Sequence, residues 1–327
     1  MRDEPADISC GDIAGFLSEY WAFHPTEVTY APVGGGCHHW IAVDAVGQRW
    51  FVTANQLDPY GSWLGPTAEC TRIAEEVAMR AAKELADRGY AFVIAPIPDC
   101  SGRLTRHIMP SWTLLVLPYV DGWSTRGGEW KDRGERTQIA GILGRLHIAT
   151  PPETLRRWDF AVPGRDALTT ALAELDQPWM CGPYAEPTRQ RLAGAIGHVR
   201  GQFERYDALV CQIEASGDPW VVTHGEPHSA NVIRTEDGRM CLIDWGTAQL
   251  APRERDLAVL HDGPSDYLPP YQAEAGPYAP RAEAIELFHV WWGLAEIGSY
   301  VQIFRRPHTD SLDNKQSWQN LTMYVPG

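Results

Sequence analysis

The pattern of apolar residues changes once along this chain of 327 residues, close to Pro118. Before that point, short runs rich in β-branched and aromatic residues alternate with turns, which is typical of strands. After it, apolar residues recur every three to four positions over long stretches, which is typical of amphipathic helices. The sequence therefore predicts a sheet-based part followed by a mainly helical part.

The part before Pro118 is expected to form a small antiparallel sheet with one inserted helix, after an opening helix around 13–21. Apolar residues at four-residue spacing predict that the inserted helix covers 67–88 in about five turns, with Gly89 as its C-terminal cap. The strand candidates are the runs 28–33, 40–43, 50–54, 91–95 and 113–117.

The part after residue 122 is expected to be mainly helical, with one interruption. The turn signal Glu236-Asp237-Gly238 predicts a β-hairpin within that interruption. The expected helices cover 137–147, much of 166–216 and the stretch from 282, and the expected strands are 220–223, 231–234 and 240–243. The fold class is therefore α+β, with an N-terminal lobe of residues 1–117, a hinge at 118–122 and a C-terminal lobe of residues 123–327.

Charge and cysteine content exclude several classes of partner. A formal net charge of −14 argues against nucleic acid as a partner, because no basic field would attract phosphate backbones. The seven cysteines lie far apart without a CxxC pair, so neither a zinc site nor a disulfide framework is predicted. The N-terminus lacks a basic, apolar leader and no segment stays apolar for about 18 residues, so we expect a cytoplasmic protein without membrane association.

Three residues in the C-terminal part suit phosphoryl transfer. Glu226 follows the expected strand at 220–223, Asn231 begins the hairpin and Asp244 ends it. The hairpin folds Asp244 back towards Asn231, and an amide oxygen with a carboxylate suits Mg²⁺. A carboxylate at Glu226 could orient an acceptor hydroxyl. Asn and Asp are also common turn residues, so the prediction rests on the spaced set.

These motifs resemble a known superfamily. The segments 224–231 (HGEPHSAN) and 242–245 (LIDW) resemble the catalytic loop and the metal-binding motif of the aminoglycoside phosphotransferase and choline kinase superfamily, relatives of the protein kinases. The similarity extends to 142–147 (ILGRLH) and to 251–258 (APRERDLA), the latter being most similar to spectinomycin-type phosphotransferases. The resemblance implies a protein-kinase-like fold of two lobes.

The resemblance also implies roles at the matching positions. Glu226 takes the place of the catalytic carboxylate, although the family usually has Asp there, so the carboxylate lies one methylene further out. Asn231 and Asp244 would hold magnesium. Asp256 would steady the catalytic loop, and His224 is expected to stabilise the same loop by hydrogen bonding.

A second departure concerns the lysine that the family uses for the α- and β-phosphates. The strand at 50–54 occupies its place, the best-aligned residue is Thr53, and no lysine occurs before residue 83. The helix partner of that lysine would be Glu75 or Glu76, and without it we expect both to lie on a solvated helix face. Either another donor takes over the phosphate contact, for which the candidates by position are His38, His39, Arg72 and Arg80, or phosphate binding rests on magnesium and backbone amides.

The N-terminal part contains two candidate nucleotide contacts. A triple glycine between two expected strands permits close backbone approach to phosphates, and the same pattern suits a flexible hairpin turn. The stretch 117–120 resembles the interlobe hinge that binds a purine, where Pro118 offers no N–H. The nucleotide-binding candidates are therefore Gly34, Gly35, Gly36, Leu117, Tyr119 and Val120, with Mg²⁺ and either ATP or GTP as the implied cofactors.

We therefore expect an antibiotic O-phosphotransferase that moves the γ-phosphate of a nucleoside triphosphate to a hydroxyl of a small molecule, in resistance or self-protection. The acceptor is an aminoglycoside or aminocyclitol such as spectinomycin, or a nucleoside antibiotic of the capuramycin kind. The alternatives are a metabolite kinase on the same fold and a pseudokinase that binds nucleotide without turnover. The acceptor-site candidates, chosen by position, are Asp262, Asp266, Tyr267, Tyr271, Trp291, Trp292 and Glu296.

Overall fold

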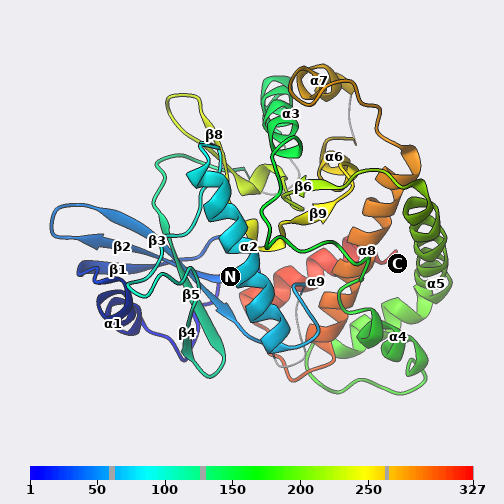
Figure 1. The fold of residues 1–327 in the computed structure, drawn as a ribbon. Coiled ribbons are helices and arrows are strands. Elements are labelled where there is room, and N and C mark those ends of the chain that lie inside the picture. The colour runs from blue at the N-terminus through cyan, green and yellow to red at the C-terminus, as the bar shows by residue number, and fades with distance from the viewer. Residues whose placement is uncertain (59–62, 126–129, 262–264, 327) are drawn as a thin grey trace. The chain divides into compact units, whose positions relative to one another are not determined.

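The computed structural model describes residues 1–58, 63–125, 130–261 and 265–326 (Figure 1). The chain divides into two compact units, the first formed by Met1–Trp158 with Trp220–Ala279 and the second by Asp159–Pro219 with Pro280–Gly327. These units do not follow the boundary expected near Pro118, because the segment after it also contributes to the first unit. The division into lobes 1–117 and 123–327 around a hinge at 118–122 stays a prediction.

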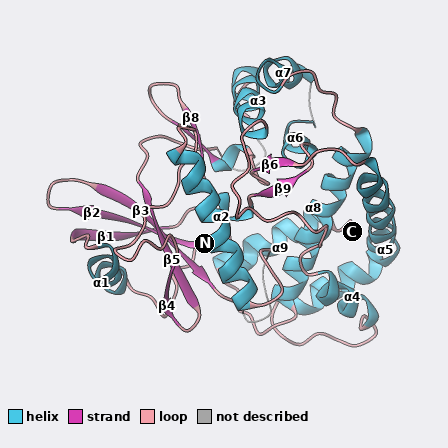
Figure 2. Cartoon of the chain, viewed as in Figure 1, coloured by secondary structure: helices cyan, strands magenta, loops and turns pink. Residues whose placement is uncertain are grey.

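The first unit contains a five-stranded antiparallel sheet with the strand order β1-β2-β3-β5-β4 (Figure 2). Alternate residues along each strand face opposite sides of this sheet. The antiparallel sheet confirms the predicted fold class. The strands are β1 (Pro25–Ala31), β2 (His38–Asp44), β3 (Arg49–Gln56), β4 (Arg106–Met109) and β5 (Trp112–Pro118).

One face of this sheet is apolar and is covered by helix α1 (Cys10–Trp21). The helix begins at Ser9, whose side chain forms a capping box with Asp12. Its buried residues Ile13, Leu17 and Trp21 recur every four positions, so they lie on one side of the helix. The strand residues packed with them are Trp40, Ala42, Trp50, Val52, Ala54, Trp112, Leu114 and Val116.

Helix α2 (Ala68–Asp87) confirms the predicted inserted helix. Thr67 caps its N-terminus through a side-chain hydrogen bond, and Gly89 follows its C-terminus with a φ of +90°. Such a positive φ is accessible to glycine at little cost. Side chains of α2 reach the face of the sheet opposite α1, where Glu75 hydrogen-bonds to residues of β3 and β5.

The prediction of a sheet strand at 91–95 is wrong. Val93 makes an isolated parallel bridge with Leu242 of a different strand, flanked by backbone hydrogen bonds. The fifth strand of the sheet is β4, a strand of four residues that pairs with β5 across a tight turn, with a shift of register between His107 and Met109. Four residues are too short for a periodic sequence pattern, so only the pairing with β5 reveals this strand.

The remaining elements of the first unit surround two small sheets, β6-β9 and β7-β8. The predicted strand at 220–223 and the predicted hairpin are both present with slightly shorter bounds. Helix α3 packs against α6 and α7. The elements are α3 (Arg133–His147), β6 (Val221–Thr223), η1 (Ser229–Asn231), β7 (Val232–Arg234), β8 (Met240–Leu242), η2 (Trp245–Thr247), β9 (Gln249–Ala251), α6 (Glu254–His261), η3 (Ser265–Tyr267) and α7 (Leu268–Ala275).

The second unit is helical. Its central helix α8 packs against the other three helices of the unit. Gly164 and Gly298 permit one close approach, because a Cβ on Gly298 would lie 2.8 Å from the carbonyl oxygen of Pro163. The helices are α4 (Arg165–Ala173), α5 (Ala185–Ser216), α8 (Ala282–Phe304) and α9 (Leu312–Tyr324).

The cysteines and the lengths of the helices bear on two expectations from the sequence. All seven cysteines are free thiols, which agrees with the absence of a predicted disulfide framework. Across the parts of the chain that the structure describes, no helix is both long and apolar enough to cross a membrane.

Candidate active site

The loop that carries Glu226 leaves the end of β6 through a glycine. Gly225 has a φ of +98°, and a Cβ at this position would lie 2.5 Å from the Nη2 atom of Arg255. Both the backbone conformation and the close approach of the guanidinium therefore require glycine. Arg255 is buried beneath the loop and donates a hydrogen bond from Nη1 to Oγ1 of Thr223 at 2.9 Å.

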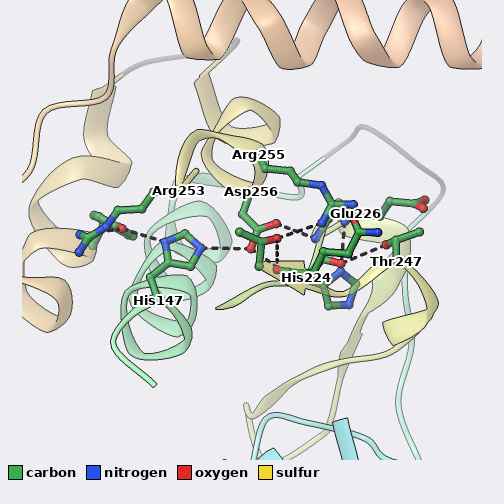
Figure 3. Close-up of polar contacts among 11 residues, drawn as sticks. His147, His224, Glu226, Thr247, Arg253, Arg255 and Asp256 are labelled. Carbon is green, nitrogen blue, oxygen red and sulfur yellow. Dashed lines mark hydrogen bonds and ion pairs between the residues drawn. The ribbon is translucent and has the colours of Figure 1, made fainter. Parts of the chain in front are cut away.

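Asp256 holds this loop through its carboxylate (Figure 3). Its fully buried carboxylate accepts hydrogen bonds from the backbone N–H of His224 at 2.8 Å and of Gly225 at 2.7 Å. The Nε2 atom of His147 donates a third hydrogen bond, at 3.1 Å. Three donors converge on one carboxylate, so the loop backbone next to Glu226 is fixed.

The hydrogen-bond network continues outward from His147. Because Nε2 donates to the carboxylate of Asp256, the Nδ1 atom is left to accept from the hydroxyl of Tyr271 at 2.8 Å. The hydroxyl of Tyr271 also accepts from Arg253 at 3.3 Å. Burial alone would raise the pKa of Asp256, but the hydrogen bond from His147 and the positive charge of Arg255 lower it below its ordinary value.

His224 stabilises the loop with both ring nitrogens. Its Nε2 atom lies 2.9 Å from the carbonyl oxygen of Ile243, so it must carry the hydrogen, and Nδ1 accepts from the backbone N–H of Glu226 at 3.2 Å. Burial lowers the pKa of His224 to about 4, which keeps the ring neutral. The hydroxyl of Thr247 donates to the carbonyl oxygen of His224 at 3.0 Å.

The β7-β8 hairpin brings Asn231 and Asp244 to the same end. Asn231 immediately precedes β7, and its carbonyl oxygen accepts a hydrogen bond at 3.0 Å from the N–H of Ile243, next to Asp244. The side-chain Nδ2 of Asn231 donates to the carbonyl oxygen of Glu226 at 3.0 Å. Because Nδ2 already donates this hydrogen bond, the Oδ1 atom is the side-chain atom of Asn231 that could bind a cation.

Asp244 has the electrostatics of a cation ligand. It adopts a left-handed backbone conformation with a φ of +63°, which is uncommon for aspartate and concentrates at functional sites. The residue is exposed to solvent, yet nearby protein desolvates its carboxylate and the charge of Glu226 adds to this effect, so the pKa rises to about 6. A bound cation would relieve this repulsion, so Asn231 and Asp244 fit a Mg²⁺ ion.

Glu226 itself is partly exposed, with 21% of its side chain accessible. Its Oε2 atom lies 3.8 Å from the Nε2 atom of His228, whose side chain is 24% accessible. The carboxylate is therefore open to a ligand, while the backbone on both sides of it is held by Asp256 and Asn231.

The prediction that Glu75 lies on a solvated helix face is wrong. Its carboxylate is buried, and it accepts hydrogen bonds from Oγ1 of Thr113 at 2.8 Å and from Nδ2 of Asn55 at 3.5 Å. Burial raises the pKa of Glu75 to about 7, and the charge of Asp244 acts in the same direction. Glu76 is partly buried as well and accepts from the N–H and the hydroxyl of Thr105.

Asn55 and Thr113 contact Glu75 and were not predicted from the sequence. In the β3-β5 register Asn55 lies opposite Thr113, and Asn55 is two residues from Thr53 on the same strand. Because alternate residues of a strand share a face, the polar residues at 53 and 55 signal a polar patch where the resemblance places a lysine. His147 was also missed, although it ends one of the motifs that carry the resemblance.

The nucleotide candidates occupy the ends of strands. Gly34 and Gly36 have positive φ values of +68° and +84° in the exposed segment between β1 and β2. Leu117 pairs with Phe51 near the end of β5, and Tyr119 follows that strand beneath the guanidinium of Arg49, 4.3 Å from the ring centroid. Gly35 lies between the two turn glycines and Val120 directly follows Tyr119, so all six candidates lie in exposed or half-buried segments.

The acceptor-site candidates lie in different surroundings. Tyr267 is fully buried with its hydroxyl 2.8 Å from Nδ1 of His261, and Asp266 forms ion pairs with Arg133 and Arg136. In these positions both side chains, like Tyr271, make structural contacts within the first unit. Three candidates lie on α8 in the second unit, namely Trp291, Trp292 and Glu296. Asp262 lies outside the described residues.

Comparison with known proteins identifies the family. The sequence pattern of the phosphotransferase enzyme family matches residues 73–285, which is more than half of the chain. Protein StrN of Streptomyces griseus is 32% identical over 253 residues, covering 74% of this chain and 74% of StrN. The matched region contains Glu226, Asn231, Asp244 and Asp256.

Solved structures share the fold across nearly the whole chain. A spectinomycin phosphotransferase in complex with ADP and spectinomycin superposes with a TM-score of 0.77 at 14% identity, covering 98% of this chain and 96% of that one. An amicoumacin kinase, solved with AMP-PNP, Ca²⁺ and its ligand, gives a TM-score of 0.60 at 15% identity over 98% of this chain and 95% of that one. The chain belongs to the phosphotransferase enzyme family and is a small-molecule kinase with a protein-kinase-like fold.

Proposed function

We propose that this enzyme transfers the γ-phosphate of ATP or GTP to a hydroxyl group of an antibiotic, in resistance or self-protection. The observation that carries the proposal is the arrangement of one loop and one hairpin. Asn231 binds the backbone of Glu226, and it shares the hairpin end with Asp244. One short stretch of chain thus holds an accessible carboxylate beside two oxygen ligands for a metal.

Each residue has a definite task in this proposal. Glu226 accepts a hydrogen bond from the acceptor hydroxyl, orients it towards the phosphorus and takes its proton late in the transfer. Asn231 and Asp244 would hold Mg²⁺, which when bound neutralises charge on the phosphate oxygens. Asp256 and His224 keep the loop backbone in place, which matters because a loose transition state is stabilised mainly by positioning.

The longer Glu226 side chain is compatible with this role. Its backbone N–H is held by His224 and its carbonyl oxygen by Asn231, so the additional methylene of the side chain does not loosen the loop backbone. The carboxylate remains accessible to an acceptor, since 21% of the side chain is exposed.

The proposal that the acceptor is an antibiotic is supported by the solved structures that share the fold. Of the two solved structures described above, the spectinomycin phosphotransferase has the higher TM-score. The amicoumacin kinase has the same fold and was solved in complex with Ami. We therefore propose an aminocyclitol, an aminoglycoside or a nucleoside antibiotic as the acceptor. A cytoplasmic location and the absence of nucleic acid and membrane partners belong to the same proposal.

A transfer assay tests the proposal. The purified protein is incubated with ATP or GTP, Mg²⁺ and a panel containing spectinomycin, an aminoglycoside, a nucleoside antibiotic and choline. We expect one antibiotic to gain the mass of one phosphate. Turnover of choline alone would replace the antibiotic assignment by a metabolite kinase, and nucleotide binding without any product would indicate a pseudokinase.

A further inference from the structure

The face of the sheet opposite α1 carries a polar pair at the position where the resemblance places a phosphate-binding lysine. Thr53 of β3 lies opposite His39 of β2 in the antiparallel register. The Nδ1 atom of His39 is 3.1 Å from Oγ1 of Thr53. The imidazole also stacks on Phe51, with ring centroids 5.0 Å apart and an interplanar angle of 29°. Two contacts therefore fix the ring.

The free edge of this imidazole faces the glycine segment. A Cβ placed on Gly34 would lie 3.2 Å from the Nε2 atom of His39, so this nitrogen is directed at the turn between β1 and β2. That turn is the segment whose glycines suit close approach of phosphates. His39 is half-buried, and its Nε2 atom faces the exposed glycine segment, from which a phosphate would approach.

The other candidates for a phosphate contact are engaged elsewhere. The adjacent His38 points to the opposite face, where its Nδ1 atom contacts the hydroxyl of Tyr30 at 3.0 Å and its ring packs on Trp112. Arg72 and Arg80 form ion pairs within α2, with Glu69 and Glu76 respectively. Of the four candidates, His39 alone contacts Thr53 among the described residues.

The carboxylate of Glu75 is surrounded by neutral donors at the position where the resemblance implies a lysine. The resemblance makes this residue one of two possible ion-pair partners of the lysine, yet here it accepts hydrogen bonds from the neutral groups of Asn55 and Thr113. Because both donors are neutral, they compensate the burial of the carboxylate only in part, and the pKa of Glu75 is raised to about 7.

We propose that His39, oriented by Thr53, donates a hydrogen bond from Nε2–H to the α- or β-phosphate of the bound nucleotide and replaces the lysine of the family. This inference rests on the proposed function, because it presumes that the enzyme binds a nucleotide. For Nε2 to carry the hydrogen, the hydroxyl of Thr53 must donate to Nδ1. Thr53 is thus a positioning residue that selects the tautomer.

The electrostatic surroundings keep this donor neutral. Burial lowers the pKa of His39 to about 3, and the N-terminal ammonium group and His38 act in the same direction. The phosphate contact is therefore a hydrogen bond from an uncharged group.

Equilibrium binding of ADP and of adenosine, both with Mg²⁺, tests the inference. Adenosine reports the base and sugar contacts, whereas ADP adds the phosphates. For His39→Ala we expect the Kd of ADP to rise about tenfold or more and that of adenosine to change less than about twofold, because one hydrogen bond to a charged group is lost. His39→Gln retains an N–H donor and should recover part of the affinity for ADP. Thr53→Val should weaken ADP binding without affecting adenosine.

The controls separate a phosphate contact from a structural role. His107→Ala removes an exposed histidine of β4 and should leave both Kd values unchanged, while thermal unfolding verifies that each variant is folded. In ¹⁵N spectra of histidine-labelled protein, the ADP complex should contain His39 as the Nε2–H tautomer.

Three results would overturn the inference. An equal loss of ADP and adenosine affinity would indicate that His39 is structural. An unchanged Kd for ADP in both His39→Ala and Thr53→Val, or its loss in Arg72→Ala instead, would place the phosphates elsewhere. Failure of the wild type to bind ADP would overturn the proposed function together with the inference, whereas ADP binding that is insensitive to position 39 would overturn the inference alone.

Discussion

The catalytic loop and the sheet face beneath α2 satisfy their buried carboxylates in different ways. Asp256 accepts hydrogen bonds from two backbone N–H groups and from His147, and its pKa is lowered, so it is held as an anion. Glu75 accepts from one amide and one hydroxyl, and its pKa is raised to about 7, so it readily binds a proton. The catalytic loop therefore stabilises a negatively charged carboxylate, whereas the sheet face favours a protonated, neutral one.

This difference agrees with the demands of the proposed phosphoryl transfer. In that proposal the loop has to place Glu226 against a reacting hydroxyl, and a fixed anion next to the loop backbone would achieve this. The sheet face would only have to hold phosphates that a metal ion neutralises, and neutral donors could do so. The loop carries Asn231 at the position of the family motif and Glu226 in place of the usual Asp, whereas the sheet face has Thr53 where the resemblance implies a lysine.

The largest effect is expected from Asp244→Asn. The change removes a charged metal ligand, so kcat should fall on the order of 10³-fold or more. Excess EDTA should abolish the activity of the wild type, and added Mg²⁺ should restore it. As a control, Asp237→Asn changes an exposed aspartate in the turn of the same hairpin and should leave kcat unaltered. Full activity of Asp244→Asn would exclude it as the metal ligand.

Glu226→Gln should reduce kcat on the order of 10²-fold or more, because the amide cannot accept the proton of the acceptor hydroxyl. The backbone contacts of the loop do not depend on this side chain, so the Kd of ADP should stay within about twofold of the wild-type value. An undiminished kcat would show that Glu226 is not the base.

Asp256→Asn should remove hydrogen bonds that hold the backbone of the catalytic loop. The amide nitrogen of asparagine would face N–H donors, so one or two of the three hydrogen bonds would be lost inside the protein. We expect the free energy of unfolding to fall by about 3 kcal/mol in denaturant titrations. A change below about 0.5 kcal/mol would contradict the account of this network.

Glu75→Gln should give the smallest effect, visible as a pH dependence of stability. The pKa of Glu75 rises from 4.5 to about 7 on folding, so the unfolded chain releases this proton first and the wild type loses stability as the pH rises through that window. The glutamine variant has no such loss. Its free energy of unfolding should gain about 2 kcal/mol relative to the wild type between pH 5 and pH 8, measured without metal. Parallel stability curves would show that Glu75 is not desolvated.

The sequence predicted the parts of this protein that depend on local pattern. Helix α2, the hairpin at Asn231 and the catalytic loop all follow from periodicity or from contiguous motifs. Strand β4 has too few residues for a pattern. In the run at 91–95, Phe92 and Val93 are apolar and buried, although the run makes only one bridge.

The rest of the site depends on pairing between distant strands. The contact of His39 with Thr53 spans 14 residues and that of Glu75 with Thr113 spans 38, and each exists because of strand register or helix packing. Glutamates on a predicted helix usually face solvent, so the burial of Glu75 could not be read from its neighbours in sequence. The family resemblance pointed to the position of Thr53 on the sheet but implied a lysine, which this chain lacks there.

The central claim is that the hairpin and its loop transfer phosphate, and isotope transfer tests it most directly. The enzyme is supplied with ATP carrying ¹⁸O in the γ-phosphate, Mg²⁺ and the antibiotic panel, and the products are weighed by mass spectrometry. With the wild-type enzyme, one antibiotic should acquire the labelled phosphate. With Asp244→Asn, the labelled antibiotic should not form. Label found only in inorganic phosphate, or equal labelling of the antibiotic by both proteins, would contradict it.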